Sequence, residues 1–281
     1  MPKVAEARNQ ARKTRWRPTP LIWASIVLHL LCLLSLVVAP VYWGWALGAV
    51  AANHALLTLV GLWPRSRWLG TNYTRLPETA IAQKQWALTI DDGPDPDVTP
   101  RVLDMLDRHG AKATFFCIGE KAARCPALCR DIVQRGHAIE NHTQHHRHTF
   151  AFFGLAALTR EIETAQATLT SLAGRTPAFF RAPAGIRSPL LDPVLTRLGL
   201  RLVAWTTRGF DTRISNAATV SRRLTRHLEP GAILLLHDGN SARSPQGVPV
   251  ILEVLPVLLD TAAAAGLRAV TLAEALPSPP A

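Results

Sequence analysis

Hydrophobic residues are distributed very unevenly along this chain of 281 residues. Between Pro18 and Pro64 there is no aspartate, glutamate, lysine or arginine, and Pro40 divides this stretch into residues 21–39 and 41–63. Each half has about 20 residues, enough to cross roughly 30 Å of hydrocarbon as a helix. Tryptophans lie at both ends of the stretch, as they do at membrane interfaces. The pattern predicts two transmembrane helices that form a hairpin.

Two other interpretations of this stretch stay open. A cleaved signal peptide is one, although such a peptide has an apolar core of about 7 to 15 residues and a small-residue cleavage site. In the other, residues 21–39 cross the membrane alone and the second half is an amphipathic or buried helix, because Asn53 and His54 interrupt it. A single span would place the remainder of the chain on the opposite side of the membrane.

Charge predicts the orientation of the hairpin. Residues 1–20 form a basic arm, in which the only acidic residue is Glu6 and the basic residues are Lys3, Arg8, Arg12, Lys13, Arg15 and Arg17. Arg65 and Arg67 follow the second half, and the turn between the halves is uncharged. Because positive residues stay on the cytoplasmic side, we expect a multi-pass protein of a bacterial inner membrane whose larger domain faces the cytoplasm.

The net charge of +11 fits the same placement. A basic arm beside a membrane span is attracted to anionic lipid headgroups. The basic residues beyond the arm are scattered, without a nucleic-acid recognition motif or interleaved aromatic residues, so a nucleic-acid partner is not expected. The four cysteines have no zinc-finger spacing and are expected to be free thiols.

Beyond residue 84, short apolar runs alternate with helical patterns. Strands are expected at residues 86–90, 113–118, 137–141, 178–181, 201–206, 232–237 and 268–272. Helices are expected at residues 98–109, 120–135, 155–173, 189–198, 217–228 and 248–265. This alternation predicts a parallel sheet covered by helices. Residues 64–83 are expected to be a linker, residues 84–275 one domain, and residues 276–281 a proline-rich tail.

Two adjacent carboxylates end the first of these apolar runs. Asp91 and Asp92 are followed by Gly93 and Pro94, which favour a sharp turn. Successive side chains of a strand point to opposite faces, so the two acids can share a site only if the backbone bends there. One acid could then hold a metal ion while its neighbour handles protons.

Partners for a metal ion follow further along the chain. His142 and His146 have a spacing of four residues, which places two imidazoles on one face of a helical turn. Two histidines and one carboxylate form a three-ligand set with an open position for water, as in hydrolytic zinc sites. A histidine pair without such a carboxylate would more often be a polar surface feature.

Three more motifs lie downstream: Arg181 in Arg-Ala-Pro-Ala-Gly, Asp211, and His237 in Leu-Leu-Leu-His-Asp. With these motifs in this order, the chain resembles the polysaccharide deacetylases of the NodB-homology type, carbohydrate esterase family 4. All five sequence motifs of that family have a counterpart here, which is far more specific than any single motif. The resemblance implies an α/β fold, a distorted (β/α) barrel of seven or eight strands, here preceded by the transmembrane hairpin.

The resemblance also implies roles for single residues: Asp91 as general base, Asp92, His142 and His146 as ligands of a divalent metal ion, Arg181 as holder of the base, Asp211 as orienter of the acid, and His237 as general acid. Zinc is the expected metal, with cobalt or nickel as alternatives. The implied activity is removal of an N-acetyl or other N-acyl group from an amino-sugar glycan or a lipid-linked saccharide.

Elementary chemistry supports the same assignment. Hydrolysis of an amide needs a nucleophilic water, a stabilised oxyanion and a proton for the departing amine, and a divalent ion serves the first two needs. An arginine partner keeps Asp91 ionised by lowering its pKa. His237 titrates near neutrality, and Asp211 would favour its charged form.

Four positions depart from the family pattern. Arg208 stands where the fourth motif usually has its first acid, and Thr212 where that motif usually has tryptophan. Ala184 replaces the usual aromatic residue of the third motif, and Arg147 replaces the usual proline after the histidine pair. These departures predict a substrate groove of a different shape. Alternatives to N-deacetylation are O-acetyl ester hydrolysis, phosphoester cleavage, and glycan binding with weak or no catalysis.

Overall fold

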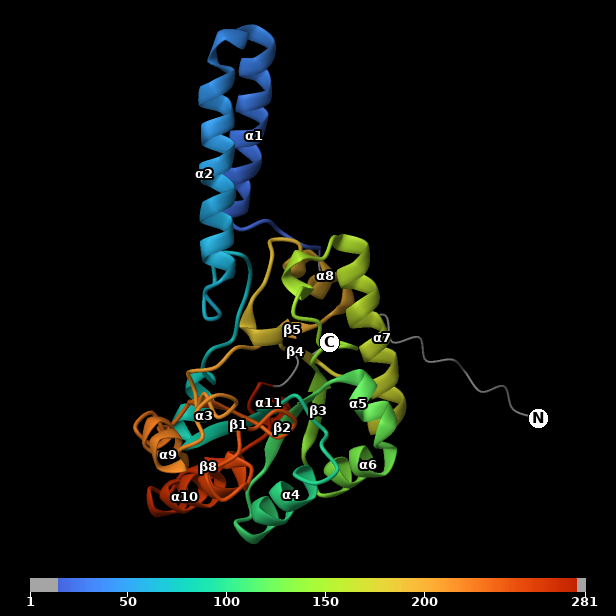
Figure 1. Cartoon of the computed structure of the whole chain (residues 1–281), viewed down its shortest axis with the longest axis vertical. Helices are drawn as coiled ribbons and strands as arrows, with labels where there is room; N and C mark the ends of the chain where they lie inside the picture. The colour runs from blue at the N-terminus through green and yellow to red at the C-terminus, as the bar shows by residue number, and fades with distance from the viewer. Residues whose placement is uncertain (1–14, 277–281) are drawn as a thin grey trace, which may run out of the picture.

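The structure is a computed structural model that describes residues 15–276. At its N-terminal end two antiparallel helices, α1 (Pro20–Val38) and α2 (Trp43–Gly61), stand side by side and clear of the other elements (Figure 1). The short 3-10 helix η1 (Pro40–Tyr42) connects them. By length and composition both helices, Pro20–Val38 and Pro40–Gly61, are apolar and long enough to cross a membrane. Lys3, Arg8, Arg12 and Lys13 of the expected basic arm lie outside the described residues, as do residues 277–281 of the expected tail.

A polar seam joins the two helices. Asn53 donates from Nδ2 to the hydroxyl of Ser25 at 2.9 Å. One turn further from the domain, Nε2 of His29 lies 3.4 Å from Nε2 of His54. These contacts are paired across the hairpin, so the polar residues that interrupt the apolar pattern face a partner helix.

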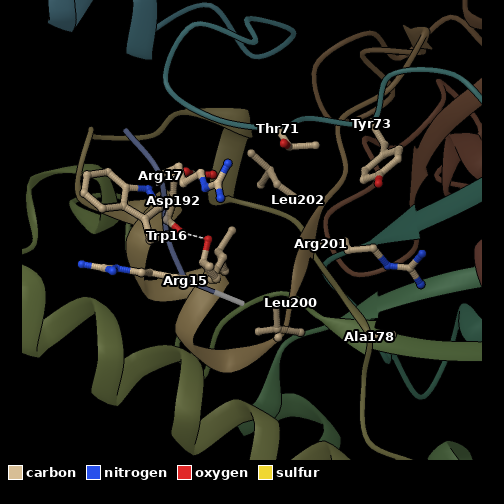
Figure 2. Close-up of a pocket in the computed structure, with 13 residues that line it drawn as sticks. Arg15, Trp16, Arg17, Thr71, Tyr73, Ala178, Asp192, Leu200, Arg201 and Leu202 are labelled. Carbon is tan, nitrogen blue, oxygen red and sulfur yellow. Dashed lines mark hydrogen bonds between the residues drawn. The ribbon is translucent and has the colours of Figure 1, made fainter. Parts of the chain in front are cut away.

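The hairpin is attached to the domain on both sides. Before α1, the indole of Trp16 donates to Oδ2 of Asp192 at 2.8 Å, and Figure 2 shows this contact on a pocket that Tyr73 and Arg201 also line. After α2, the backbone N–H of Arg187 donates to the carbonyl of Gly61 at 3.2 Å, and the Arg187 guanidinium donates to the carbonyl of Ser66. The hairpin and the domain are therefore held at two separate points.

Within residues 15–276, eight strands form one sheet in which every paired neighbour is parallel. They are β1 (Gln85–Asp91), β2 (Ala113–Cys117), β3 (Ala138–Asn141), β4 (Phe179–Phe180), β5 (Arg201–Leu202), β6 (Thr207–Arg208), β7 (Ile233–His237) and β8 (Arg268–Ala269). The order is β5-β4-β3-β2-β1-β7-β6, with β8 beside β1. Residues 203–206 lead from one end of this order to the other, so the sheet curls back on itself.

The expected barrel is thus a curled half-barrel, and the expected strand at 201–206 is only partly correct. β5 ends at Leu202: the backbone N–H of Val203 still donates to the carbonyl of Phe180 in β4, but Ala204 donates to Tyr73, outside the sheet. The parallel sheet and its helical cover are confirmed.

Helices cover the outer face of the curl (Figure 1). They are α4 (Thr99–Arg108), α5 (Gly119–Arg124), α6 (Pro126–Gln134), α7 (Leu155–Ala173), α8 (Leu191–Leu198), α9 (Ala217–Thr225) and α10 (Val250–Ala264), with the short helices α3 (Glu78–Ala82), η2 (Phe150–Phe152), η3 (Pro183–Gly185) and α11 (Leu272–Ala275) in the connections. The single helix expected at 120–135 is two helices. Cys125 has non-helical backbone angles, and Pro126, which lacks an N–H, begins the second helix.

The segment expected as a linker, residues 64–83, packs against the domain. Leu69, Leu76 and Ala80 are buried, and Tyr73 forms a bridge to Val203. α3 lies within this segment.

The side chains of strand β1 alternate between the helical side of the sheet and the interior of the curl. All of its residues are buried. Trp86, Leu88 and Ile90 pack into the cluster formed with α4 and α10, on the helical side. Because side chains alternate along a strand, Thr89 and Asp91 point the other way, into the curl.

Candidate active site

The two adjacent acids open onto one pocket of about 320 Å³ at the carboxyl ends of the strands. Asp91 is the last residue of β1, and Asp92 has a φ of 73°, so the backbone turns sharply after the strand. Gly93 follows, and a Cβ atom there would lie 2.3 Å from the carboxylate of Asp238. Only glycine fits this turn, which is the bend that brings both acids to the same pocket.

Three side chains form a cluster suited to a metal ion. Oδ1 of Asp92 lies 3.2 Å from Nε2 of His142 and 3.2 Å from Nε2 of His146. The ligand atoms of the three residues all lie within 4.8 Å of one another. Oδ1 of Asp92 is buried and accepts no hydrogen bond from the residues that the structure describes. A buried carboxylate oxygen without a hydrogen-bond donor, close to two imidazole nitrogens, is an arrangement that can bind a divalent cation.

The surroundings of this cluster hold its members in place. Nδ1 of His142 lies 2.8 Å from the carbonyl of Arg181, so Nδ1 carries the proton and Nε2 keeps its lone pair. Asn240 donates to the second oxygen of Asp92 at 2.9 Å. Burial and the neighbouring His142 lower the pKa of His146 to about 4. Sequence reasoning missed Asn240, since a lone asparagine after the His-Asp pair gives no separate signal.

The histidine pair does not lie on a helical turn, which corrects the expectation from its spacing. Residues 142–146 form a loop after β3, with positive φ angles of 68° at Thr143 and 50° at His146. The hydroxyl of Thr143 accepts from the backbone N–H of His146 at 2.9 Å, which fixes the loop. His145 turns away and pairs with Glu161 at 2.9 Å.

Asp91 is paired with a buried arginine. Nη1 of Arg181, which directly follows β4, donates to Oδ1 of Asp91 at 2.7 Å and to the hydroxyl of Thr89 at 2.8 Å. The carbonyls of Val203 and Ala204 accept its remaining hydrogen bonds. The guanidinium also stacks 4.1 Å from the ring centroid of Phe116. The arginine is therefore fixed from several sides and holds Asp91 in one orientation.

His237 ends β7, the strand next to β1, in register with Asp91, and is paired with Asp211. Nδ1 of His237 lies 3.0 Å from Oδ1 of Asp211, and the backbone N–H of His237 donates to Oδ2 at 2.8 Å. Burial acts to lower the pKa of His237, but the charge and hydrogen bond of Asp211 raise it above its ordinary value. Nδ1 is thus occupied, and Nε2 is the nitrogen left for a substrate.

The structure brings together every site residue expected from the sequence. Asp91, Asp92, His142, His146 and His237 line the pocket directly, while Arg181 and Asp211 lie behind two of them. Three of the four departures from the family pattern also lie at this pocket, since Ala184, Arg208 and Thr212 form part of its wall, whereas Arg147 does not line it. His148 is a further lining residue that the sequence did not single out for a role.

Comparisons with known proteins agree on one family. The family model for polysaccharide deacetylase matches residues 79–203. A chitooligosaccharide deacetylase of Azorhizobium caulinodans is 38% identical over 162 residues, covering 57% of this chain and 77% of that protein. A peptidoglycan-N-acetylglucosamine deacetylase of Bacillus cereus is 33% identical over 196 residues, covering 69% of this chain and 89% of that protein.

A solved structure extends the likeness to the fold. The family 4 acetyl xylan esterase of Clostridium thermocellum, in complex with a cobalt ion, superimposes with a TM-score of 0.60 at 32% identity, covering 68% of this chain and 89% of that one. The residues matched by the family model include Asp91 at the end of β1 and His142 in the loop after β3. The chain belongs to the polysaccharide deacetylase family.

Proposed function

We propose that this protein hydrolyses the N-acetyl group, or another N-acyl group, of an amino sugar in a glycan or a lipid-linked saccharide. One observation carries the proposal: a three-ligand metal cluster, an arginine-held carboxylate and a carboxylate-held imidazole face the same pocket. Binding of a glycan would need none of these three arrangements. Metal-assisted hydrolysis of an amide has a use for each of them: the metal ion activates the water, the carboxylate takes its proton and the imidazole protonates the amine.

Asp92, His142 and His146 would hold the metal ion. An ion bound there would lower the pKa of a water molecule toward neutrality and polarise the acyl carbonyl. Two nitrogen ligands and one oxygen ligand suit zinc, cobalt or nickel. The cobalt ion of the Clostridium thermocellum relative supports a divalent transition metal in this family position.

Asp91 would remove the proton of the attacking water. The buried guanidinium of Arg181 lies 2.7 Å from its carboxylate. The same contact fixes the carboxylate in position, so little rearrangement is needed for proton transfer. Arg181 is therefore a positioning residue, and Asp91 the base.

His237 would donate the proton that the departing amine needs when the C–N bond breaks. With Nδ1 held by Asp211, the proton leaves from Nε2. The pKa of His237 lies above its ordinary value, so the donor form persists at neutral pH. The products are a free amine on the sugar and a carboxylate.

We further propose that α1 and α2 anchor the protein in the bacterial inner membrane, with the catalytic domain on the cytoplasmic side. Support comes from their apolar surfaces and from the basic residues on the domain side, among them Arg15, Arg17, Arg65 and Arg67. The substrate would then be a precursor at the inner leaflet.

The test is a substrate panel on the full-length protein in detergent micelles or nanodiscs, with zinc or cobalt added back. N-acetylglucosamine oligomers, N-acylated lipid-linked sugars and O-acetylated xylan are compared by release of acetate. Asp91→Asn should abolish turnover yet keep the metal, and His237→Ala should lower turnover by roughly 10² to 10⁴.

The matched control is Asp97→Asn, because Asp97 is an exposed acid outside the pocket. It should keep full turnover. Loss of metal in Asp91→Asn would mean that Asp91 and Asp92 have each other's roles, and full activity in His237→Ala would remove the general acid. Faster release from xylan than from every amide would favour the ester hydrolase.

A further inference from the structure

Arg208 forms one wall of the active-site pocket and is only partly exposed. Its guanidinium carbon lies 4.6 Å from the ring centroid of Phe210 and 5.3 Å from that of Trp205. The two rings fix the plane of the guanidinium against the wall. The side chain therefore has a defined position beside the reacting groups.

Within residues 15–276 no hydrogen bond or ion pair holds this guanidinium, and Nε is buried without a partner. Arg181, which is fully buried, has its charge matched by Asp91. A buried N–H of a charged group without an acceptor is costly to leave unpaired. An arginine in this state has donors available for a ligand with oxygen atoms.

The carboxylates near Arg208 already have other partners. Asp91 is bonded to Arg181, and Asp211 to His237. The second oxygen of Asp92 accepts from Asn240, and the first faces the histidine pair. None of these three carboxylates therefore forms an ion pair with Arg208.

A second cation lies at the mouth of the same pocket. Arg213 lines it and is exposed to solvent. The segment that the family resemblance expects to carry an acid thus carries a partly buried arginine, Arg208, with an exposed arginine, Arg213, beyond it. Arg208 is the last residue of β6, and Arg213 lies in the loop that follows it.

Part of the pocket wall lies against the chain that follows the hairpin. A Cβ at Gly185, which lines the pocket, would lie 2.7 Å from Pro64, three residues beyond α2. Arg65 donates to the carbonyl of Thr206, beside the Trp205 that supports Arg208. The pocket mouth is thus built in part by the chain as it leaves the proposed membrane span.

We propose that Arg208, with Arg213, binds a phosphate group of the substrate, and that the substrate is a membrane-anchored amino-sugar phosphate. This inference rests on the proposed function, because it names the substrate class of the same site. A planar guanidinium offers paired donors to phosphate oxygens, and a substrate that stays in the lipid surface meets a pocket mouth built at that surface. Arg208 is a specificity residue in this proposal and takes no part in proton transfer.

The experiment uses full-length protein in nanodiscs and four N-acetylated probes. These are a neutral N-acetylglucosamine oligomer, N-acetylglucosamine 1-phosphate, farnesyl-diphospho-N-acetylglucosamine and N-acetylmuramic acid, which carries a carboxylate. The measured quantity is kcat/KM for each charged probe relative to the neutral one. Wild-type protein should favour both phosphates by roughly 10-fold to 100-fold.

Arg208→Gln should remove that preference, mainly through KM for the phosphates, and Arg208→Lys should restore part of it. The matched control is Arg223→Gln, because Arg223 stacks on the same Phe210 ring at 4.7 Å but does not line the pocket. It should keep the wild-type preference. If Arg208 only filled space against the rings, Arg208→Gln would lower kcat/KM equally for all probes.

Two outcomes overturn the inference while leaving the proposed function in place. One is turnover of the neutral oligomer with no preference for phosphate, and the other is a preference for the carboxylate of N-acetylmuramic acid over both phosphates. Failure to release acetate from any probe, with metal bound, would instead overturn the proposed function.

Discussion

The pair formed by Arg181 and Asp91 should contribute more to stability than any exposed ion pair of this domain. Only 1% of the Arg181 side chain is exposed, and 4% of Asp91. Arg181→Met keeps the aliphatic length of the side chain but removes donors to Asp91, Thr89, Val203 and Ala204. It leaves a buried carboxylate without its cation, so we expect a loss of about 3–5 kcal/mol in the free energy of unfolding.

The measurement is chemical denaturation of full-length protein in detergent micelles, followed by the fluorescence of buried tryptophans such as Trp86. Arg175→Met is the matched control, because Arg175 also donates to a buried carboxylate at 2.7 Å, that of Glu140. Glu140 keeps hydrogen bonds from the backbone N–H groups of Ala178 and Phe179, and Arg175 is 46% exposed. Its loss should cost about 1 kcal/mol.

A double variant, Arg181→Met with Asp91→Asn, separates charge from packing. It should be more stable than the sum of the single losses by about 0.5–3 kcal/mol, because no unpaired charge stays buried. The reasoning is refuted if Arg181→Met costs no more than Arg175→Met, or if neutralising Asp91 recovers nothing. Either result would mean that water or another donor reaches Asp91 once the guanidinium is gone.

Three further predictions concern the site and the membrane. Elemental analysis should find about one divalent ion per wild-type chain and none in the His142→Ala, His146→Ala double variant. Near-stoichiometric metal in that variant would contradict the ligand set. Asp211→Asn removes the charge that raises the pKa of His237. The alkaline limb of the kcat profile, where the acid loses its proton, should therefore move to lower pH. An unchanged limb would exclude His237 as the titrating acid. A fluorescent reporter fused after Arg67 should be active and a periplasm-dependent phosphatase at the same place silent, whereas an active phosphatase would show that α2 does not cross the membrane.

Much of the fold could be predicted because its strands are buried on both faces and read as continuous apolar runs. β1, β2 and β7 lie within one residue of their predicted bounds at either end. The two-residue strands β4, β5, β6 and β8 could not be delimited, since a pair of ladder bonds leaves no periodic pattern. α3, with five residues, is also too short to show a helical period, so its segment was expected to be a linker.

The site was predicted more completely than the fold around it, because strand ends gather in space whatever the length of the strands. What the residues do chemically stays a prediction. The loop at His142 and His146 was expected as a helical turn because the spacing of four fits one, and spacing alone cannot reveal the positive φ angles found there. The contact of Asn240 with Asp92 depends on the path of a loop after β7, which no pattern in the sequence specifies.

If α1 and α2 span a membrane as we propose, their attachment to the domain at both sides would limit where this enzyme works. Trp16 holds the chain before α1, and Arg187 holds the chain after α2. Attachment at these two points would restrict rotation of the domain relative to the hairpin. The pocket mouth would then keep one height and one tilt above the bilayer. Acyl groups would be reachable only within a narrow layer next to the lipid, and sugars further along a growing chain would pass out of range.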